Sequence, residues 1–400
     1  MMPNKKILLL GGSAQQVIAI DKAKELGFDT VLCDYLPDNP GQYHADRFYQ
    51  TSTTDKEAVL KIAENEGIDG IIAYASDPAA PTAAFVAEKL GLPTNPYESV
   101  EILCNKDRFR EFLLQNGFHT PTAHGYGSIE EAKNDLNNFE FPVIIKPVDS
   151  SGSKGATVMH SPDKIEEALS LAFSFSRSKR IIIEGFIEKN HPYLIGGDIF
   201  VVDGKVVLWG LLNCHRDERV NKLVPVGKSY PLDLRDEYAM AVRETLQKMV
   251  DKLGIRQGAM NVELVVDKKG QVWPIDVGPR NGGNMIPDLL GMIFGVDVVD
   301  MSVRAAMGES INIETPSGVP YFATHNLHSD RDGIYADILF DEAIEKHIVK
   351  KCIYKKDGDT VEFFDNASKA LGIVFMKFES MSEMSEMLSN VYDHITVVLR

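Results

Sequence analysis

The sequence predicts an α/β protein whose first part is built on parallel strands and whose middle part mixes α and β elements (α+β). Two patterns predict this class. Near the N-terminus, apolar runs typical of buried strands alternate with helical patterns, as in βαβ units. Further on, apolar runs are joined in pairs by short turns containing Asp-Gly or Lys-Gly, which indicates antiparallel hairpins. The composition agrees, because 44% of the 400 residues are hydrophobic and 25% are charged, as in ordinary globular proteins.

The first part shows strand and helix patterns in alternation. The strands are predicted at 5–10, 29–34 and 69–74, and the helices at 14–26, 55–66 and 79–90. The turn after the first strand begins with Gly11-Gly12 and does not continue as G-x-G-x-x-G. The sequence therefore gives no indication of dinucleotide binding of the NAD type.

The middle part begins with an amphipathic helix predicted at 105–117, in which Phe109, Phe112 and Leu113 form the apolar face. It continues with strands at 142–148, 156–159 and 180–184, helices at 163–176 and 235–253, hairpins around 202–205 and over 259–277, and a polar loop over 214–232. A linker is predicted at 310–320, followed by short strands and one helix at 382–393.

The charge and the cysteines exclude several classes of function. The net charge of −16 argues against nucleic acid and anionic membranes as partners. No apolar stretch approaches the ~18–20 residues of a membrane span. The four cysteines are isolated, so their spacing fits neither a zinc site nor a disulfide framework. These observations predict a protein of the reducing cytoplasm.

A predicted strand that contains Lys146 runs into a loop of small residues. The loop contains Ser150, Ser151, Gly152, Ser153 and Gly155. Small residues let successive backbone N–H groups converge on an anion, and a lysine adds a full charge, so the segment is a candidate phosphate site. An ordinary surface loop has a similar composition, and the residues alone leave both interpretations open.

The second predicted hairpin carries two carboxylates, Glu263 and Asp276. If Val266 pairs with Gln271, Glu263 lies opposite Pro274 and Asp276 is its diagonal neighbour on the same face. Two carboxylates on a buried face are costly without a cation, and hard oxygen ligands suit Mg²⁺ or Mn²⁺. Two solvated strand carboxylates are the alternative interpretation.

Two further groups of polar residues are candidates for binding a substrate anion. Arg280 lies in the Gly-rich turn after this hairpin, where a guanidinium can hold a carboxylate or phosphate through two hydrogen bonds. His215, Arg216 and Arg219 lie in the predicted polar loop. They either bind a substrate carboxylate or belong to a solvated loop.

The order of these residues along the chain resembles that of ATP-grasp enzymes. Lys106 precedes a helix, Lys146 precedes the Gly/Ser loop, Glu184 ends a strand, and the hairpin carboxylates follow. The resemblance covers nearly the whole chain and is strongest to single-unit ligases of the carbamoyl-phosphate-synthase and biotin-carboxylase type. It implies a Rossmann-like pre-ATP-grasp domain (1–100), an ATP-grasp domain (101–310) with a lid at about 118–185, and a small mixed C-terminal domain (311–400).

The resemblance also implies a role for each matching position. Lys106, Lys146 and the loop from Ser150 to Gly155 would hold the phosphates of ATP, Glu184 and Ile187 the adenine, and Asp198 the ribose. Glu263 and Asp276 would bind Mg²⁺ or Mn²⁺, and Lys146 and Arg280 would act in catalysis. Asn281 and Asn284 are candidates for contact with the substrate or for a further metal-binding oxygen.

The implied activity is that of an ATP- and Mg²⁺-dependent ligase, which activates a substrate carboxylate as an acyl phosphate for attack by an amine. Small-molecule substrates and a homodimer are expected. A purine-biosynthesis-type carboxylase or formyl ligase is an alternative. The sequence has Asp276 where the family usually has Glu, and Gly278 where it usually has Asn. These departures keep a non-catalytic ATP-binding protein open as well.

Overall fold

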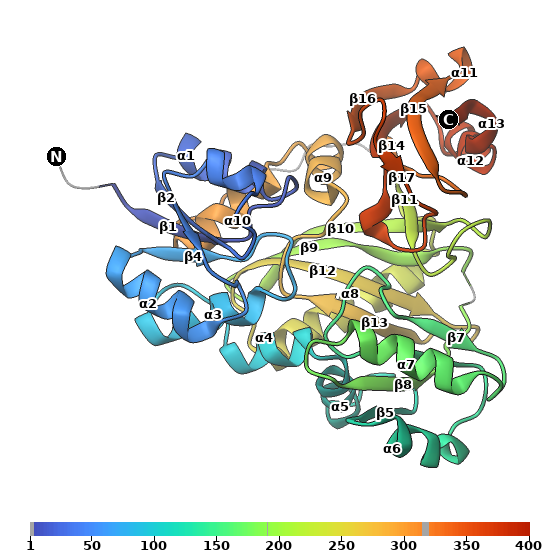
Figure 1. Ribbon diagram of the computed structural model, residues 1–400, viewed down its shortest axis with the longest axis horizontal. Coiled ribbons are helices and arrows are strands. Elements are labelled where there is room, and N and C mark those ends of the chain that lie inside the picture. Colours follow the sequence, from blue (N-terminus) through green and yellow to red (C-terminus); the bar gives the residue numbers. More distant parts are fainter. Residues whose placement is uncertain (1–3, 190, 314–319) are drawn as a thin grey trace.

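The computed structural model describes residues 4–189, 191–313 and 320–400, and it begins with a parallel sheet (Figure 1). The sheet has the order β3-β2-β1-β4, with β1 (Lys6–Leu10), β2 (Asp29–Asp34), β3 (Arg47–Gln50) and β4 (Gly70–Ile72). The helices that follow are α1 (Val17–Glu25), α2 (Lys56–Glu66) and α3 (Ala80–Leu90). These elements confirm the predicted α/β class. The strand β3 was not predicted, because its sequence RFYQ contains no apolar run.

Both faces of the N-terminal sheet are covered by helices. Leu8 and Leu10 pack with α2 and α3, whereas Ile7 and Leu9 pack with α1 and with α10 (Val298–Ala306). Side chains alternate between the two faces of a strand. The unbroken apolar run of β1 therefore provides apolar contacts for the helices on both faces.

An antiparallel sheet of eight strands forms the centre of the molecule. Its order is β13-β12-β9-β10-β11-β14-β18-β16. The strands that precede residue 310 are β9 (Leu194–Val202), β10 (Lys205–Arg216), β11 (Pro225–Tyr230), β12 (Gly258–Val266) and β13 (Val272–Gly278). Helix α8 (Asp236–Leu253) covers one face, and α9 (Ile286–Phe294) and α10 cover the other.

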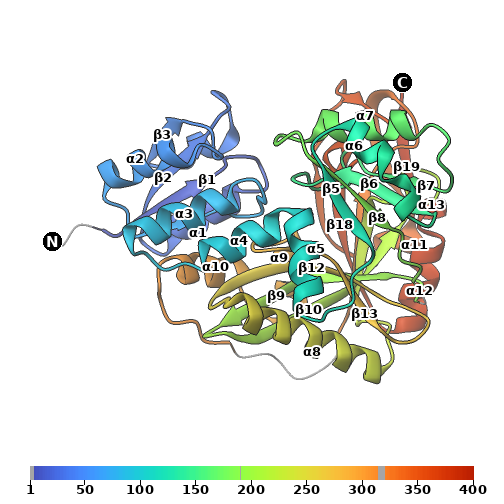
Figure 2. The same ribbon diagram turned by 90° about the horizontal axis from the view of Figure 1, so that it is seen from below.

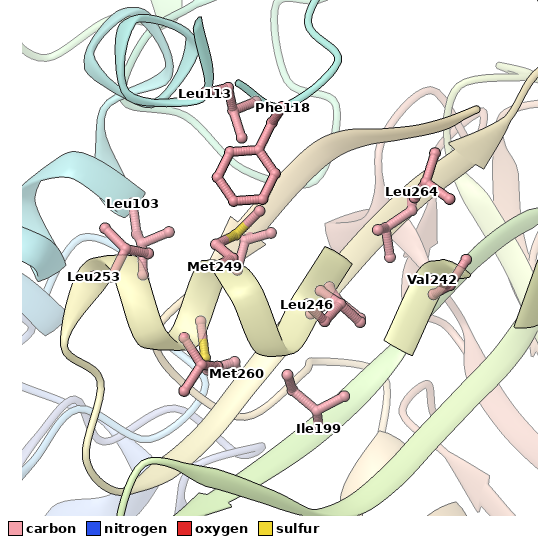
Figure 3. Close-up of a cluster of buried hydrophobic side chains, with 14 of the residues drawn as sticks. Leu103, Leu113, Phe118, Ile199, Val242, Leu246, Met249, Leu253, Met260 and Leu264 are labelled. Carbon is pink, nitrogen blue, oxygen red and sulfur yellow. The ribbon is translucent and has the colours of Figure 1, made fainter. Parts of the chain in front are cut away.

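Helix α8 packs through a row of apolar side chains spaced at helical intervals. Figure 3 shows Leu246, Met249 and Leu253 from this helix, with Ile199 and Met260 from the strands beneath it. All five side chains are buried. The helix ends at Gly254, whose φ of 62° is the left-handed conformation that glycine adopts without strain.

The segment expected to form a lid has a sheet and a core of its own. The sheet order is β5-β8-β6-β7, with β5 (Ala123–Tyr126), β6 (Val143–Pro147), β7 (Thr157–Met159) and β8 (Ile181–Gly185). Helices α6 (Ile129–Asn134) and α7 (Ile165–Phe175) pack on it around a separate cluster of buried residues. Figure 2 shows this group standing beside the N-terminal part, with α4 (Tyr97–Cys104) and α5 (Lys106–Gln115) between them. The helix α4 was not predicted.

The C-terminal residues extend the central sheet. The strands β14 (Tyr321–Leu327), β18 (Gly372–Phe378) and β16 (Ile348–Ile353) continue it beyond β11. The remaining elements are β15 (Gly333–Phe340), β17 (Thr360–Val361), β19 (Ile395–Leu399), α11 (Glu342–Glu345), α12 (Met381–Ser389) and α13 (Val391–His394). Residues 314–319 of the predicted linker lie outside the described residues. The three domain boundaries stay predictions, and the central sheet crosses the one at residue 310.

The expected polar loop at 214–232 is wrong in part. Residues up to Arg216 belong to β10, and Pro225–Tyr230 form β11, which is paired on both sides. The segment Gly227-Lys228-Ser229 reads as a loop in the sequence. It is a strand because β10 and β14 supply its hydrogen-bond partners, a tertiary effect that local propensity does not contain.

Candidate active site

The two hairpin carboxylates lie directly opposite each other. Glu263 on β12 pairs with Asp276 on β13. The predicted register is wrong, because Val266 pairs with Val272 instead of Gln271. A bulge at Ile275 then inserts one extra residue into β13, which brings Asp276 opposite Glu263. The carboxylates are therefore direct neighbours, at a separation of about 5 Å between Cβ atoms, rather than the diagonal pair that was predicted.

Each hairpin carboxylate has a cation beside it. The Nζ of Lys106, at the start of α5, lies 3.7 Å from Oδ2 of Asp276 and donates a hydrogen bond to the carbonyl oxygen of Ser150 at 2.8 Å. Arg216 Nη2 donates to Oε1 of Glu263 at 2.5 Å. The side chains of Asp276 and Glu263 are still 42% and 29% exposed. Their oxygens are therefore accessible to a ligand.

The carboxylate pair fits Mg²⁺ by its chemistry. Magnesium is usually bound by one or two carboxylates together with water and substrate phosphates. Among the residues that the structure describes, no group of three or more His, Cys, Asp or Glu side chains is placed to hold a metal ion. Two adjacent carboxylates are the donor set of an ion whose other ligands come from a nucleotide.

Lys146 belongs to a buried group of three charges. Its Nζ lies 2.8 Å from Glu184 Oε2, and Arg110 on α5 donates to both oxygens of Glu184 at 3.0 and 3.1 Å. Burial opposes ionisation of Glu184, but Arg110 and Lys146 outweigh it and lower its pKa to about 2. Burial also lowers the pKa of Lys146. Glu184 thus holds Lys146 in place, and its role at the adenine stays a prediction.

Arg110 also ties this group to the hairpin. It donates to the carbonyl oxygens of Pro274 and Ile275, at 3.0 and 2.8 Å; Ile275 is the bulged residue and Pro274 the one before it. Sequence reasoning missed this residue. A signal was present, because Arg110 lies within the buried stripe of α5, and an arginine buried there requires an acceptor.

The Gly/Ser loop contains three residues with a left-handed backbone, and its role at phosphates stays a prediction. Gly152, Ser153 and Gly155 have φ values of 67°, 61° and 72°, and Ser153 Oγ donates to the carbonyl oxygen of Leu223 at 3.0 Å. Ser151 is exposed, and Ser150 contacts Lys106 through its carbonyl group. The loop therefore lies beside Lys106, whereas Ile187 is half-buried in the segment after β8.

Arg280 forms a partly buried ion pair with a residue that sequence reasoning missed. Its Nε and Nη2 donate to Oδ1 and Oδ2 of Asp77 at 2.6 and 2.5 Å, across 203 residues of sequence. Burial disfavours the charged form of Arg280. The carboxylate of Asp77 outweighs this effect, and the pKa of Arg280 is raised. Burial likewise opposes ionisation of Asp77, yet Arg280 lowers its pKa. Ala75 has a φ of 51°, a strained value for a residue other than glycine, in the turn that delivers Asp77.

The same ion pair explains the departure at Gly278. A Cβ atom on Gly278 would lie 2.6 Å from Asp77 Oδ1 and 3.3 Å from the guanidinium of Arg280. A side chain at this position would therefore displace the pair. A cavity of about 380 Å³ opens beside it and is lined in part by Asp77, Lys106 and Asp276.

Asp198 lies on β9, on the same face of the central sheet as Glu263. It is 1% exposed, and its oxygens accept hydrogen bonds from Asn261 Nδ2 and from the backbone N–H of Gly282 at 2.9 and 2.7 Å. Burial raises its pKa to about 6. Asp198 anchors the turn that carries Arg280, and its role at the ribose stays a prediction.

The candidate substrate residues are only partly brought together. Arg216 reaches Glu263, but His215 bonds Ser229 Oγ at 2.8 Å, and Arg219 pairs with Asp217 and covers the ring of Tyr392. Burial lowers the pKa of His215 to about 4. Asn281 is 2% exposed and Asn284 has a left-handed φ of 53°, both in the turn after Arg280.

Comparison with known proteins identifies the class to which this fold and site belong. Residues 105–314 match the model for the carbamoyl-phosphate synthase L chain, ATP-binding domain, and residues 20–94 match that for the ATP-grasp N-terminal domain. The chain is therefore a member of the ATP-grasp family.

Individual relatives resemble the chain over most of its length. The carbamoyl phosphate synthase large chain of Clostridium beijerinckii is 24% identical over 83% of this chain and 32% of its own. The chain spans about a third of the length of such curated relatives. The L-amino acid ligase of Bacillus licheniformis has a TM-score of 0.82 at 20% identity, with 100% of both chains covered.

A third relative was solved with ligands. It is the biotin carboxylase domain of Hydrogenobacter thermophilus 2-oxoglutarate carboxylase, a dimer with MgADP, ADP and bicarbonate. Its TM-score is 0.72 at 18% identity, over 99% of this chain and 91% of that chain. These likenesses confirm the predicted fold. No described helix of the present chain is long and apolar enough to cross a membrane.

Proposed function

We propose that the protein is an ATP- and Mg²⁺-dependent ligase that activates a small carboxylate as an acyl phosphate for attack by an amine. The observation that carries this proposal is the direct pairing of Glu263 with Asp276, with Lys106 Nζ 3.7 Å from Asp276. Two hard oxygen donors next to a lysine would suit Mg²⁺ together with nucleotide phosphates.

The chain's own residues then have separate tasks. Lys106 and Lys146 bind the phosphates, the backbone of the Gly/Ser loop covers them, and Glu263 with Asp276 holds Mg²⁺. When bound, Mg²⁺ supplies charge neutralisation at the phosphates. The substrate carboxylate displaces ADP from the γ-phosphorus; the amine then attacks the carbonyl carbon, phosphate leaves, and the nitrogen loses a proton.

Arg280 is suited to hold the acyl group during these steps. A guanidinium has five N–H donors, of which two bond Asp77 and one bonds the carbonyl oxygen of Asn281. Two donors remain for a ligand oxygen. The proposal therefore needs no displacement of Asp77.

The test is release of ADP in the presence of Mg²⁺, hydroxylamine and a panel of carboxylates, because hydroxylamine traps acyl phosphates. A hydroxamate and ADP should form together with at least one acid. Binding of ATP without turnover on any acid of the panel would favour a non-catalytic ATP-binding protein instead.

Lys146→Ala provides the matched site variant. It should weaken ATP binding by at least tenfold, since it removes a charge-assisted contact to phosphate. Lys205 lies on β10 with its side chain 73% exposed, so Lys205→Ala is the control. Full ATP affinity in Lys146→Ala would contradict the phosphate assignment.

A purine-type carboxylase or formyl ligase differs from this proposal only in substrate, and ribonucleotide substrates in the same assay distinguish the two. A homodimer and a cytoplasmic location belong to the proposal as well. The dimeric biotin carboxylase domain supports the first, and light scattering of the purified protein tests it.

A further inference from the structure

Lys228 is a buried lysine that no carboxylate of the described residues contacts directly. It lies on β11, is 9% exposed and pairs across the sheet with Cys214 on β10 and Thr324 on β14. Its Nζ contacts Cys214 Sγ at 2.5 Å, and among the residues that the structure describes it forms no ion pair with a carboxylate. Sulfur is a weak acceptor, and an ammonium group has three donors. A lysine this buried is almost always paired.

The side chain of Lys228 points toward the hairpin carboxylates. A Cβ atom on Gly196 of β9 would lie 3.0 Å from Lys228 Nζ and 2.5 Å from Cys214 Sγ. The lysine therefore extends across β10 and reaches β9. Gly196 in turn pairs with Glu263 on β12. Paired residues of an antiparallel sheet share a face, so the ammonium group and both hairpin carboxylates lie on the same face.

Strand spacing separates the ammonium group of Lys228 from Asp276. Asp276 lies on β13, two strands beyond β9, which corresponds to about 10 Å. Lys106 lies at the Asp276 end of this face. The Gly/Ser loop runs from Ser150 beside Lys106 to Ser153, which bonds Leu223 just before β11.

The charges around Lys228 act on it only from a distance. Asp198 is a buried carboxylate on the same face and interacts electrostatically with Lys228, but its oxygens are hydrogen-bonded to Asn261 and Gly282. Glu263 is already paired with Arg216. His215 lies on the other face, where it bonds Ser229. Among the described residues, no carboxylate forms an ion pair with the ammonium group of Lys228.

We propose that Lys228 forms an anion subsite that binds the carboxylate of the substrate to be phosphorylated, with Arg216 beside it. This inference rests on the proposed function, and it assigns the acceptor end of the same site. Because Gly196 has no side chain, it leaves room for the ammonium group of Lys228 to reach the substrate carboxylate. A small oxyanion at this point would accept hydrogen bonds from the ammonium group directly, which no carboxylate of the described residues does.

The test compares Lys228→Met, a variant of similar length without the charge, with Lys205→Met as the exposed control. Three measurements are made on the full chain. They are the affinity for AMP-PNP with Mg²⁺, the thermal stability in sodium acetate against sodium chloride at equal ionic strength with saturating AMP-PNP, and the KM for any acid found active in the hydroxamate assay.

Lys228→Met should bind AMP-PNP within twofold of the wild type. Its melting temperature without ligand should rise by about 2–4 °C, because a buried charge that has no ion-pair partner in direct contact is removed. Stabilisation by acetate should be lost, and the KM for the acid should rise about 10- to 150-fold, as for a lost charge-assisted hydrogen bond. Lys205→Met should change none of these.

Two results would overturn the inference. A tenfold loss of AMP-PNP affinity would assign Lys228 to the nucleotide, and a lower melting temperature with unchanged acetate dependence would make it structural. If Lys228→Met does not fold, Gly196→Ala repeats the measurement, and an unchanged KM there would count against the subsite. If no acid is turned over by the wild type, the proposed function fails, whereas acetate stabilisation of the wild type alone still supports the subsite.

Discussion

Replacing Asp77 by Asn should destabilise the protein by about 3 kcal/mol. Removing one partner of a buried ion pair typically costs about 3–5 kcal/mol, because the other charge is left uncompensated. The side chains of Arg280 and Asp77 are 13% and 23% exposed, so some solvent reaches them and the lower end of that range applies. The change in shape is small, since Asn has the size of Asp.

The assay is urea unfolding followed by circular dichroism, with Asp38→Asn as the control. Asp38 is an exposed residue of the same domain, and its replacement should change stability by less than about 0.5 kcal/mol. Asp77 has a lowered pKa in the folded protein. Its contribution is therefore fully present above the unfolded pKa of about 4 and is lost as the pH falls through the folded value. The difference between wild type and Asp77→Asn should be constant from pH 6 to 8 and shrink below about pH 4.

A double-mutant cycle decides whether the ion pair is the cause. If Asp77 acts through Arg280, the loss in Asp77→Asn combined with Arg280→Gln should be smaller than the sum of the two single losses. Additive losses, or an Asp77→Asn variant as stable as the Asp38→Asn control, would refute the reasoning.

Three further predictions concern single positions. Gly278→Ala should destabilise by about 1–3 kcal/mol, measured by urea unfolding, because its Cβ would meet Asp77 Oδ1 at 2.6 Å; an unchanged midpoint would contradict the role given to this glycine. Met249→Ala should cost about 2–5 kcal/mol in the same assay through the cavity it leaves under α8, with exposed Met240→Ala as the control. Glu184, with a pKa of about 2, should stabilise the protein fully above about pH 5, and this contribution should be lost as the pH falls from about 4.5 toward 2. Acid unfolding of Glu184→Gln and of the wild type, followed side by side, measures this contribution of Glu184 to stability. Identical unfolding profiles would contradict a stabilising charge on Glu184.

The sequence predicted those parts of the fold whose information is local. The helix at 235–253 follows from its apolar spacing and its terminal glycine, and α8 occupies nearly the same residues. The first strand follows from an unbroken apolar run, which a sheet covered on both faces requires. Glu263 and Asp276 were found for a similar reason, because the turn between them is a strong hairpin signal.

The parts that were missed depend on contacts between distant residues. Asp77 meets Arg280 only when the N-terminal and central sheets are assembled, and no local pattern marks it. The bulge at Ile275 changes the register, and nothing in the continuous apolar run from Val272 to Ile275 marks its position. The strand β11 contains Lys228 between two small residues, and its pairing with two neighbours outweighs that composition.

The position of β11 between β10 and β14 has a consequence for the design of chimeras. Lys228 is fixed on one side by residues before 310 and on the other by the C-terminal strand β14. An exchange of the C-terminal ninety residues with those of a relative would therefore replace β14, the strand that pairs with β11. The surroundings of Lys228 in the proposed ligand site would change with it. A recombination point between the N-terminal sheet and α4 would leave the eight paired strands intact, but it would have to preserve the match between Asp77 and Arg280.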